Sequence, residues 1–152
     1  MKIGVPKEIK PQENRIGLTP DSVKTLTSNG HEVLVENDGG FEAGFDNNQY
    51  KSAGAKIIDK AEDIFNDAEI IVKVKEPLSN EVKMLRENQI VFTYLHLAAA
   101  KELTKGLVDS KAVCIAYETV TDNNGRLPLL APMSAVAGRM SVQAGAHCLE
   151  KN

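Results

Sequence analysis

Short apolar runs rich in β-branched residues alternate along the chain with segments whose apolar residues recur at helical spacing. Six runs have the length of buried strands, and they cover residues 2–5, 31–36, 55–58, 69–74, 90–94 and 112–116. Helical segments fill the intervals, at residues 20–28, 47–53, 60–66 and 99–108, with a further helix capped by Ser79. This alternation predicts a three-layer α/β domain, in which a largely parallel sheet carries helices on both faces.

The pattern changes after the last of these strands. Residues 122–125 predict a turn, and two prolines within residues 127–132 predict an extended connector, because a proline disfavours helix in the residue before it. A long helical pattern rich in small residues starts at Ser134 and runs to Asn152. This helix lies either in the centre of the same domain or between it and a second domain or subunit. We therefore divide the chain into a domain at residues 1–132 and the start of a long linking helix at 133–152.

Composition narrows the class of protein. The chain has 152 residues, and its 18 Lys and Arg against 21 Asp and Glu give a net charge of −3 with interleaved signs, which argues against nucleic acid as the main partner. It shows neither a signal peptide nor an apolar run near the roughly 18 residues of a membrane span. Cys114 and Cys148 lie in apolar runs and lack metal-ligand spacing, so we expect two core thiols, no metal site and a cytoplasmic location.

Three side chains able to bind or move charge follow the carboxyl ends of predicted strands. Arg15 comes after the first strand, Lys75 after the fourth and His96 within the segment after the fifth. Ligands bind at this edge of a parallel sheet, because loops and helix N-termini gather there. A guanidinium grips a carboxylate with two hydrogen bonds, an ammonium stabilises charge on a carbonyl oxygen, and an imidazole passes a proton near neutral pH. The combination suits a small 2-oxo or 2-amino acid.

Each of these residues also has an ordinary structural interpretation. Arg15 alone is typical of a solvated loop, and His96 in apolar surroundings is typical of a hydrogen-bonded core histidine. Lys75 could pair with Glu76, an exposed contact usually worth under about 1 kcal/mol. Lys73 lies two residues earlier on the same strand face, and we favour Lys75 because it falls at the end of the strand.

Two other segments carry weaker signals. The glycine-rich residues 38–44 match neither the dinucleotide nor the P-loop spacing, so we expect a loop that needs positive φ angles. Ser134 lacks the surroundings of a nucleophile elbow, which argues against acyl transfer.

Six separated motifs, in order along the chain, resemble the amino-terminal part of the alanine dehydrogenase family. They lie at residues 1–8 (MKIGVPKE), 14–20 (NRIGLTP), 73–77 (KVKEP), 93–98 (TYLHLA), 116–120 (AYETV) and 127–134 (LPLLAPMS). The resemblance covers essentially the whole chain and implies a Rossmann-like fold followed by a long interdomain helix.

The resemblance implies NAD-dependent, reversible oxidative deamination of L-alanine to pyruvate and ammonium. By their match to the family, Arg15 and Lys75 bind the substrate, His96 is the acid/base at the substrate's oxygen, and Ser134 lies near the nicotinamide of NAD. The chain has no Gly-x-Gly-x-x-Gly, and the family places its cofactor domain after the long helix. We therefore expect this chain to be about two fifths of the family's usual length, as a cut piece or a truncated gene product, and to be inactive alone.

Other interpretations remain open. Transhydrogenase α subunits share the opening motif but do not usually carry the matching lysine and histidine, whereas saccharopine-type dehydrogenases use a similar pair and are the closer rival. A non-catalytic module that binds a small carboxylate, or supports assembly, is the alternative outside enzymes. Because the helix from Ser134 would leave an apolar face without its second domain, we also expect a homo-oligomer.

Overall fold

The computed structural model describes residues 1–151 of the chain. It divides into two compact units, the first spanning Met1–Ala116 and the second beginning at Tyr117, and each is described by itself. The predicted boundary at residues 132 and 133, and the roles given to the two parts, stay predictions.

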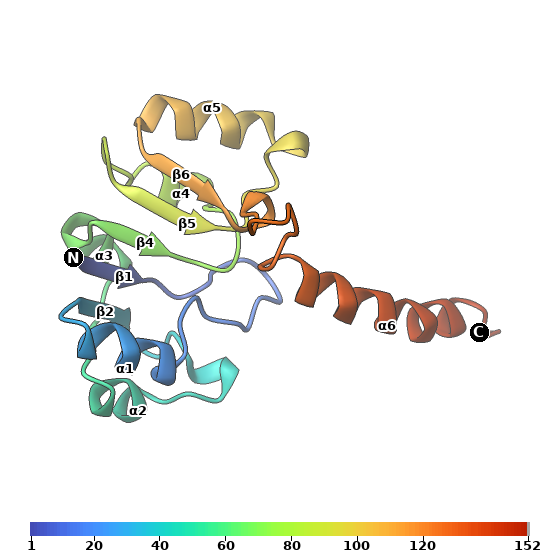
Figure 1. The fold of residues 1–152 in the computed structure, drawn as a ribbon, viewed down its shortest axis with the longest axis horizontal. Helices are drawn as coiled ribbons and strands as arrows, with labels where there is room; N and C mark the ends of the chain where they lie inside the picture. The colour runs from blue at the N-terminus through green and yellow to red at the C-terminus, as the bar shows by residue number, and fades with distance from the viewer. Residues whose placement is uncertain (152) are drawn as a thin grey trace. The chain divides into compact units, whose positions relative to one another are not determined.

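The first unit is built on a six-stranded sheet whose pairings are all parallel (Figure 1). The strands are β1 (Lys2–Val5), β2 (Glu32–Glu36), β3 (Lys56–Ile58), β4 (Ile70–Val72), β5 (Ile90–Thr93) and β6 (Val113–Ala116). Their order across the sheet is β3-β2-β1-β4-β5-β6. The chain therefore winds outward from β1 in both directions, and the Rossmann-like fold expected from the sequence is confirmed.

Helices connect the strands, as the parallel pairing requires. They are α1 (Pro20–Ser28), α2 (Asn47–Ser52), α3 (Ala61–Asp67), α4 (Ser79–Val82) and α5 (Lys101–Ser110), with 3-10 turns η1 (Phe41–Ala43) and η2 (Leu97–Ala99). The Thr19 hydroxyl caps α1 by accepting the Ser22 N–H, with Pro20 in the first turn where its missing N–H costs nothing.

Two apolar clusters cover the two faces of the sheet. Val23 of α1 and Tyr50 of α2 pack with Val33 and Val35 of β2 on one face. On the other face α3, α4 and α5 supply the cover, with the buried side chains Ile64, Phe65 and Leu107. Leu34 belongs to the second cluster while its neighbours in sequence belong to the first, as the period of two along a strand demands.

Two helix starts differ from the sequence prediction. The helix expected at residues 99–108 begins at Lys101, because the chain first makes the turn η2. Ser79 does not cap α4 but is its first residue, and the Glu81 carboxylate accepts the Leu78 N–H at 2.8 Å. A carboxylate from within the first turn thus satisfies the N–H of Leu78, the residue just before the helix.

The second unit holds the turn η3 (Tyr117–Thr119) and the long helix α6 (Ala131–Cys148). The helix includes Ala131 and Pro132, which the sequence assigned to an extended connector, because a proline in the first turn leaves no hydrogen bond unmade. It ends at Cys148 rather than continuing, and Asn152 of the predicted linking helix lies outside the described residues. Within residues 1–151, no helix combines the length and apolar character that a membrane crossing requires.

The two cysteines differ from the expectation that both belong to the core. Cys114 is half-buried, and this burial raises the pKa of its thiol. Cys148 is exposed near the end of α6, so its assignment to the core was wrong. An apolar run of sequence did not distinguish a covered face of a helix from an uncovered one.

Candidate functional site

The strand order brings three loops of the first unit together. Strand β1 pairs with β4, and β4 pairs with β5, so the segments after these strands leave the same edge of the sheet side by side. These three segments are the polar loop with Arg15, the segment from Lys73 to Pro77 and the segment with His96. The topology thus brings together the three segments that the sequence predicted to lie at one edge of the sheet.

A buried ion-pair triad lies beneath this edge. The Lys73 ammonium is 2.8 Å from Glu81 Oε1 and 3.2 Å from Glu8 Oε2, and the three side chains are 1%, 3% and 2% exposed, respectively. A charge this deep is stable only with partners, and here two carboxylates supply them. Lys73 is therefore bound within the protein, which separates it from Lys75, whose side chain is 25% exposed.

The same triad holds the backbone of Lys75. The Glu8 carboxylate accepts the N–H of Val74 at 2.6 Å and that of Lys75 at 3.3 Å. On its other side the fully buried Thr93 donates its hydroxyl to the Lys75 carbonyl at 3.0 Å. Residues of β5 and of the loop after β1 thus fix the point from which the Lys75 side chain leaves the sheet.

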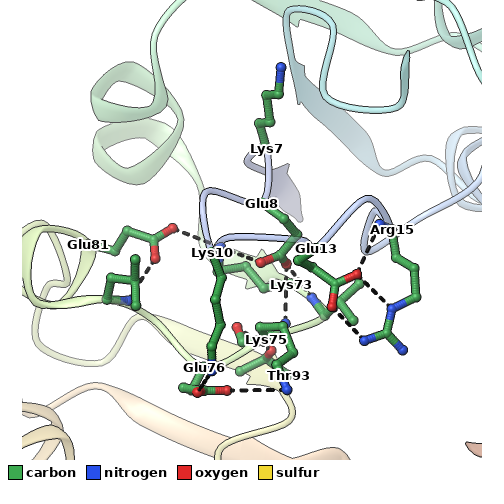
Figure 2. A network of polar contacts seen from close by, with 12 residues as sticks. Lys7, Glu8, Lys10, Glu13, Arg15, Lys73, Lys75, Glu76, Glu81 and Thr93 are labelled. Carbon is green, nitrogen blue, oxygen red and sulfur yellow. Dashed lines mark hydrogen bonds and ion pairs between the residues drawn. The ribbon is translucent and has the colours of Figure 1, made fainter. Parts of the chain in front are cut away.

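Arg15 is paired with a carboxylate that the sequence prediction did not single out. Its Nε donates to Glu13 Oε1 at 2.7 Å and its Nη2 to Glu13 Oε2 at 2.6 Å, and Figure 2 shows the two side chains facing each other. Hydrogen bonding from Arg15 lowers the pKa of Glu13, and the charge of Lys75 adds to the effect. The same hydrogen bond raises the pKa of Arg15. Glu13 therefore lies under the influence of both predicted substrate-binding cations.

Close approach of the backbone brings the Arg15 loop down onto β4. A Cβ atom added to Gly17 would lie 2.6 Å from the Val72 carbonyl oxygen, a separation that no side chain tolerates without a shift. Glycine at this position therefore lets the segment after Arg15 lie against the strand that leads to Lys75.

Glu76 lies next to both Lys75 and His96, two of the residues predicted from the sequence. Its Oε2 atom is 3.9 Å from the Lys75 ammonium and 3.4 Å from His96 Nδ1, and its Oε1 atom pairs with Lys10 (Figure 2 shows Lys75 and Glu76 side by side). Burial raises the pKa of Glu76, but the hydrogen bond from Lys10 and the charges of Lys10 and Lys75 outweigh it and leave this pKa lowered. The carboxylate is therefore ionised at neutral pH.

His96 stands in an unusual backbone conformation just before η2. Its φ of 50° and ψ of 39° are left-handed, which costs energy for a residue with a side chain. Its ring stacks on Tyr94, with centroids 5.9 Å apart and an angle of 30° between the planes. The side chain is 54% exposed, so the expectation of a core histidine does not describe it.

The charges at this edge balance. Lys10, Arg15, Lys73 and Lys75 provide four cations, and Glu8, Glu13, Glu76 and Glu81 provide four carboxylates, so the net charge is zero before His96 is counted. The side chains of Arg15 and Lys75 are 45% and 25% exposed, whereas Lys73 is buried, so these two cations are the ones that a small carboxylate can reach. Of the acidic partners Glu13 and Glu76, the sequence had indicated Glu76 as a pair for Lys75, whereas Glu13 was missed because a carboxylate in a polar loop is indistinguishable in sequence from a solvated one.

The remaining sequence candidates belong to other elements of the chain. Ser134 is on α6 of the second unit. The glycine-rich loop after β2 has positive φ at Asp38 and Gly44, 55° and 87°, which confirms the expected backbone. A cavity of about 490 Å³ lies between α4 and α5 with Glu76 on its wall, and neither Lys75 nor His96 lines it.

The first unit does not fit a dinucleotide. Dinucleotide sites place a glycine-rich turn after the first strand, so that backbone N–H groups reach the pyrophosphate. Here that turn carries Pro6, which has no N–H, and the buried carboxylate of Glu8, which accepts backbone N–H groups itself.

Fold and site together define a Rossmann-like α/β domain with a cluster of paired charged side chains at the carboxyl edge of its sheet. Residues 4–137 match the family model described as "Alanine dehydrogenase/PNT, N-terminal domain". The alanine dehydrogenases of Halomonas elongata and Bacillus subtilis are 56% and 55% identical to the chain over 151 residues. The chain belongs to this alanine dehydrogenase/PNT family.

Solved structures agree with the family assignment. An L-alanine dehydrogenase matches 99% of the chain with a TM-score of 0.91 and 53% identity, and a transhydrogenase from Sinorhizobium meliloti matches 78% with a TM-score of 0.73 and 27% identity. The chain spans 41% of that dehydrogenase chain and 35% of the transhydrogenase chain. It covers 41% and 39% of the Halomonas and Bacillus enzymes.

Proposed function

We propose that this chain is the substrate-binding part of an NAD-dependent L-alanine dehydrogenase, which interconverts L-alanine with pyruvate and ammonium. The observation that carries the proposal is the cluster of Arg15, Lys75 and His96 at one sheet edge, linked through Glu13 and Glu76. The 50–56% identity to alanine dehydrogenases over almost the whole chain supports the same reaction. The substrate class is a three-carbon 2-oxo or 2-amino acid.

Arg15 binds the substrate carboxylate in this proposal. Its guanidinium carries N–H donors in a rigid, planar fork that matches the two oxygens of a carboxylate, as its pairing with Glu13 illustrates. Lys75 neutralises the negative charge that develops on the carbonyl oxygen of pyruvate. Both interactions are strong because the acidic partners hold the cations in place before substrate arrives.

His96 exchanges the proton at the substrate's oxygen. In deamination the carbon that carries nitrogen must at one stage carry a hydroxyl group, and an imidazole removes or returns that proton near neutral pH. The half-exposed ring at the sheet edge supports this role. NAD, when bound, accepts the hydride of the substrate carbon.

The cofactor, location and assembly belong to the proposal as well. Because the first unit does not fit a dinucleotide, we propose that NAD is bound mainly by a domain outside residues 1–152, with Ser134 near the nicotinamide. A cytoplasmic homo-oligomer is the proposed setting, and the two free thiols support a reducing compartment.

Calorimetric titration of the purified chain with pyruvate tests the site. We expect Arg15→Ala to weaken binding roughly 30-fold, since a hydrogen bond to a charged group contributes about 2 kcal/mol. Lys7→Ala is the matched control, because the Lys7 side chain points away from the cluster in Figure 2 while belonging to the same loop. Equal weakening by both variants, or binding that neither affects, contradicts the proposal, and no binding by any form leaves only an assembly role.

A further inference from the structure

Glu76 has an oxygen with an unusual environment. Its Oε2 atom is buried and accepts no hydrogen bond within the described part of the chain, although Glu76 Oε1 is paired with Lys10. A buried carboxylate oxygen without a hydrogen-bond donor costs free energy, so a donor beside it stabilises the protein. Its neighbours are His96 Nδ1 at 3.4 Å and the Lys75 ammonium at 3.9 Å.

The imidazole of His96 is held in the matching orientation. The left-handed backbone at His96 and the stacking on Tyr94 both restrict the ring, and they leave Nδ1 on the side of Glu76. An ionised carboxylate can only accept a hydrogen bond, so an Nδ1 atom that faces it must carry the hydrogen. In a neutral imidazole the other nitrogen is then bare.

We propose that Glu76 is a positioning residue that fixes the neutral imidazole of His96 as the tautomer with hydrogen on Nδ1. Nε2 is then the atom that exchanges the substrate's proton, a consequence that rests on the proposed function. The O–H bond of the substrate hydroxyl breaks, an N–H bond forms at Nε2, and the electron pair stays on the substrate oxygen. The imidazolium so formed is stabilised by Glu76, which keeps its negative charge throughout.

The other two histidines provide internal references. His147 Nδ1 is also 3.4 Å from a carboxylate, that of Glu150, but these side chains are 83% and 70% exposed, so water competes for both groups. His31 Nδ1 lies 3.4 Å from the N-terminal nitrogen of Met1 and not beside a carboxylate. Neither ring should therefore show the single tautomer that we expect of His96.

Long-range ¹H–¹⁵N correlation spectra of the full chain measure this directly, because protonated and bare ring nitrogens have well-separated ¹⁵N shifts. In spectra of the neutral ring, recorded at alkaline pH, we expect His96 to show hydrogen on Nδ1 and a bare Nε2 in nearly all molecules. Hydrogen on Nε2 of His96, or the same mixture as at His147, overturns the proposal. The spectrum of the unaltered protein decides this, even if a variant fails to fold.

Substitution then shows whether Glu76 is the cause. We expect Glu76→Ala to convert His96 to a mixture like that of His147, with Glu150→Ala as the control that leaves His96 unchanged. A folded Glu76→Ala protein that keeps hydrogen on Nδ1 contradicts the role of Glu76. Because these spectra need no substrate, they can succeed when pyruvate fails to bind, or fail when it binds, so this inference and the proposed function are tested separately.

Discussion

Replacing Lys73 by methionine removes the ammonium that balances two buried carboxylates. Lys73 Nζ lies 3.2 Å from Glu8 and 2.8 Å from Glu81, and none of the three side chains is more than 3% exposed. Methionine fills much of the lysine's volume, so the change in charge dominates over the change in packing. Breaking a buried ion pair in this way costs about 3–5 kcal/mol.

Such a loss is large compared with the 5–15 kcal/mol that stabilises a typical domain. For a chain of this length it corresponds to a fall of roughly 6–20 °C in the unfolding temperature. Urea unfolding followed by circular dichroism measures the free energy, and thermal unfolding measures the shift in midpoint. Lys56→Met is the matched control, because the pair of Lys56 with Glu32 is 66% and 38% exposed and should contribute little.

The triad also predicts an asymmetry between its members. It contains one ammonium and two carboxylates, so Glu81→Gln leaves a balanced pair of Lys73 with Glu8, whereas Lys73→Met leaves two carboxylates without a cation. We expect Glu81→Gln to destabilise the protein clearly less than Lys73→Met. A Lys73→Met protein as stable as the Lys56→Met control, or a larger loss for Glu81→Gln, refutes the reasoning.

Three further outcomes follow from the site and its surroundings. Glu13→Gln weakens the two hydrogen bonds that hold the Arg15 guanidinium in place, so calorimetry should show pyruvate binding several-fold more weakly, and tighter binding would mean that Glu13 mainly competes with the substrate for Arg15. Burial raises the pKa of Glu36, outweighing its hydrogen bond from the Lys7 N–H, so ionisation there lowers stability as the pH rises through the folded-state value. Glu36→Gln should therefore gain stability over the unaltered protein between acidic and neutral pH in urea titrations, and a gain that is largest in acid contradicts this sign. The purified chain should produce no NADH from L-alanine and NAD, because the first unit does not fit a dinucleotide; measurable turnover would refute the assignment of NAD to another domain.

The fold was largely predictable because its signals are local. Each strand of the sheet is a short apolar run. The ends of a helix are signalled by residues next to it, as Thr19 before α1 and Gly30 after it show. The start of α5 was missed because the left-handed turn at His96 and η2 have no strong sequence signature. The start of α4 was missed because the residue before this helix is Leu78, whose side chain has no capping oxygen, so the sequence pointed to Ser79 instead.

The candidate site was predictable only in part. Topology alone places Arg15, Lys75 and His96 at one edge, and the choice of Lys75 over Lys73 followed from its position at the strand's end. What the sequence could not provide is that Glu13 folds back onto Arg15 and that Glu76 also reaches His96, because the first contact depends on the local path of a polar loop and the second joins the loops after β4 and β5. The burial of Lys73 likewise depends on Glu8, 65 positions earlier in the chain, which no local pattern indicates.

The claim that one sheet edge binds a small carboxylate is tested most directly by mapping amide shifts in ¹H–¹⁵N spectra as pyruvate is added to the full chain. We expect saturable shifts confined to residues 13–17, 74–76 and 94–97. The same titration of Arg15→Ala should produce little shift at these residues. Shifts that centre on the far ends of the strands, or that persist unchanged in Arg15→Ala, would contradict the account.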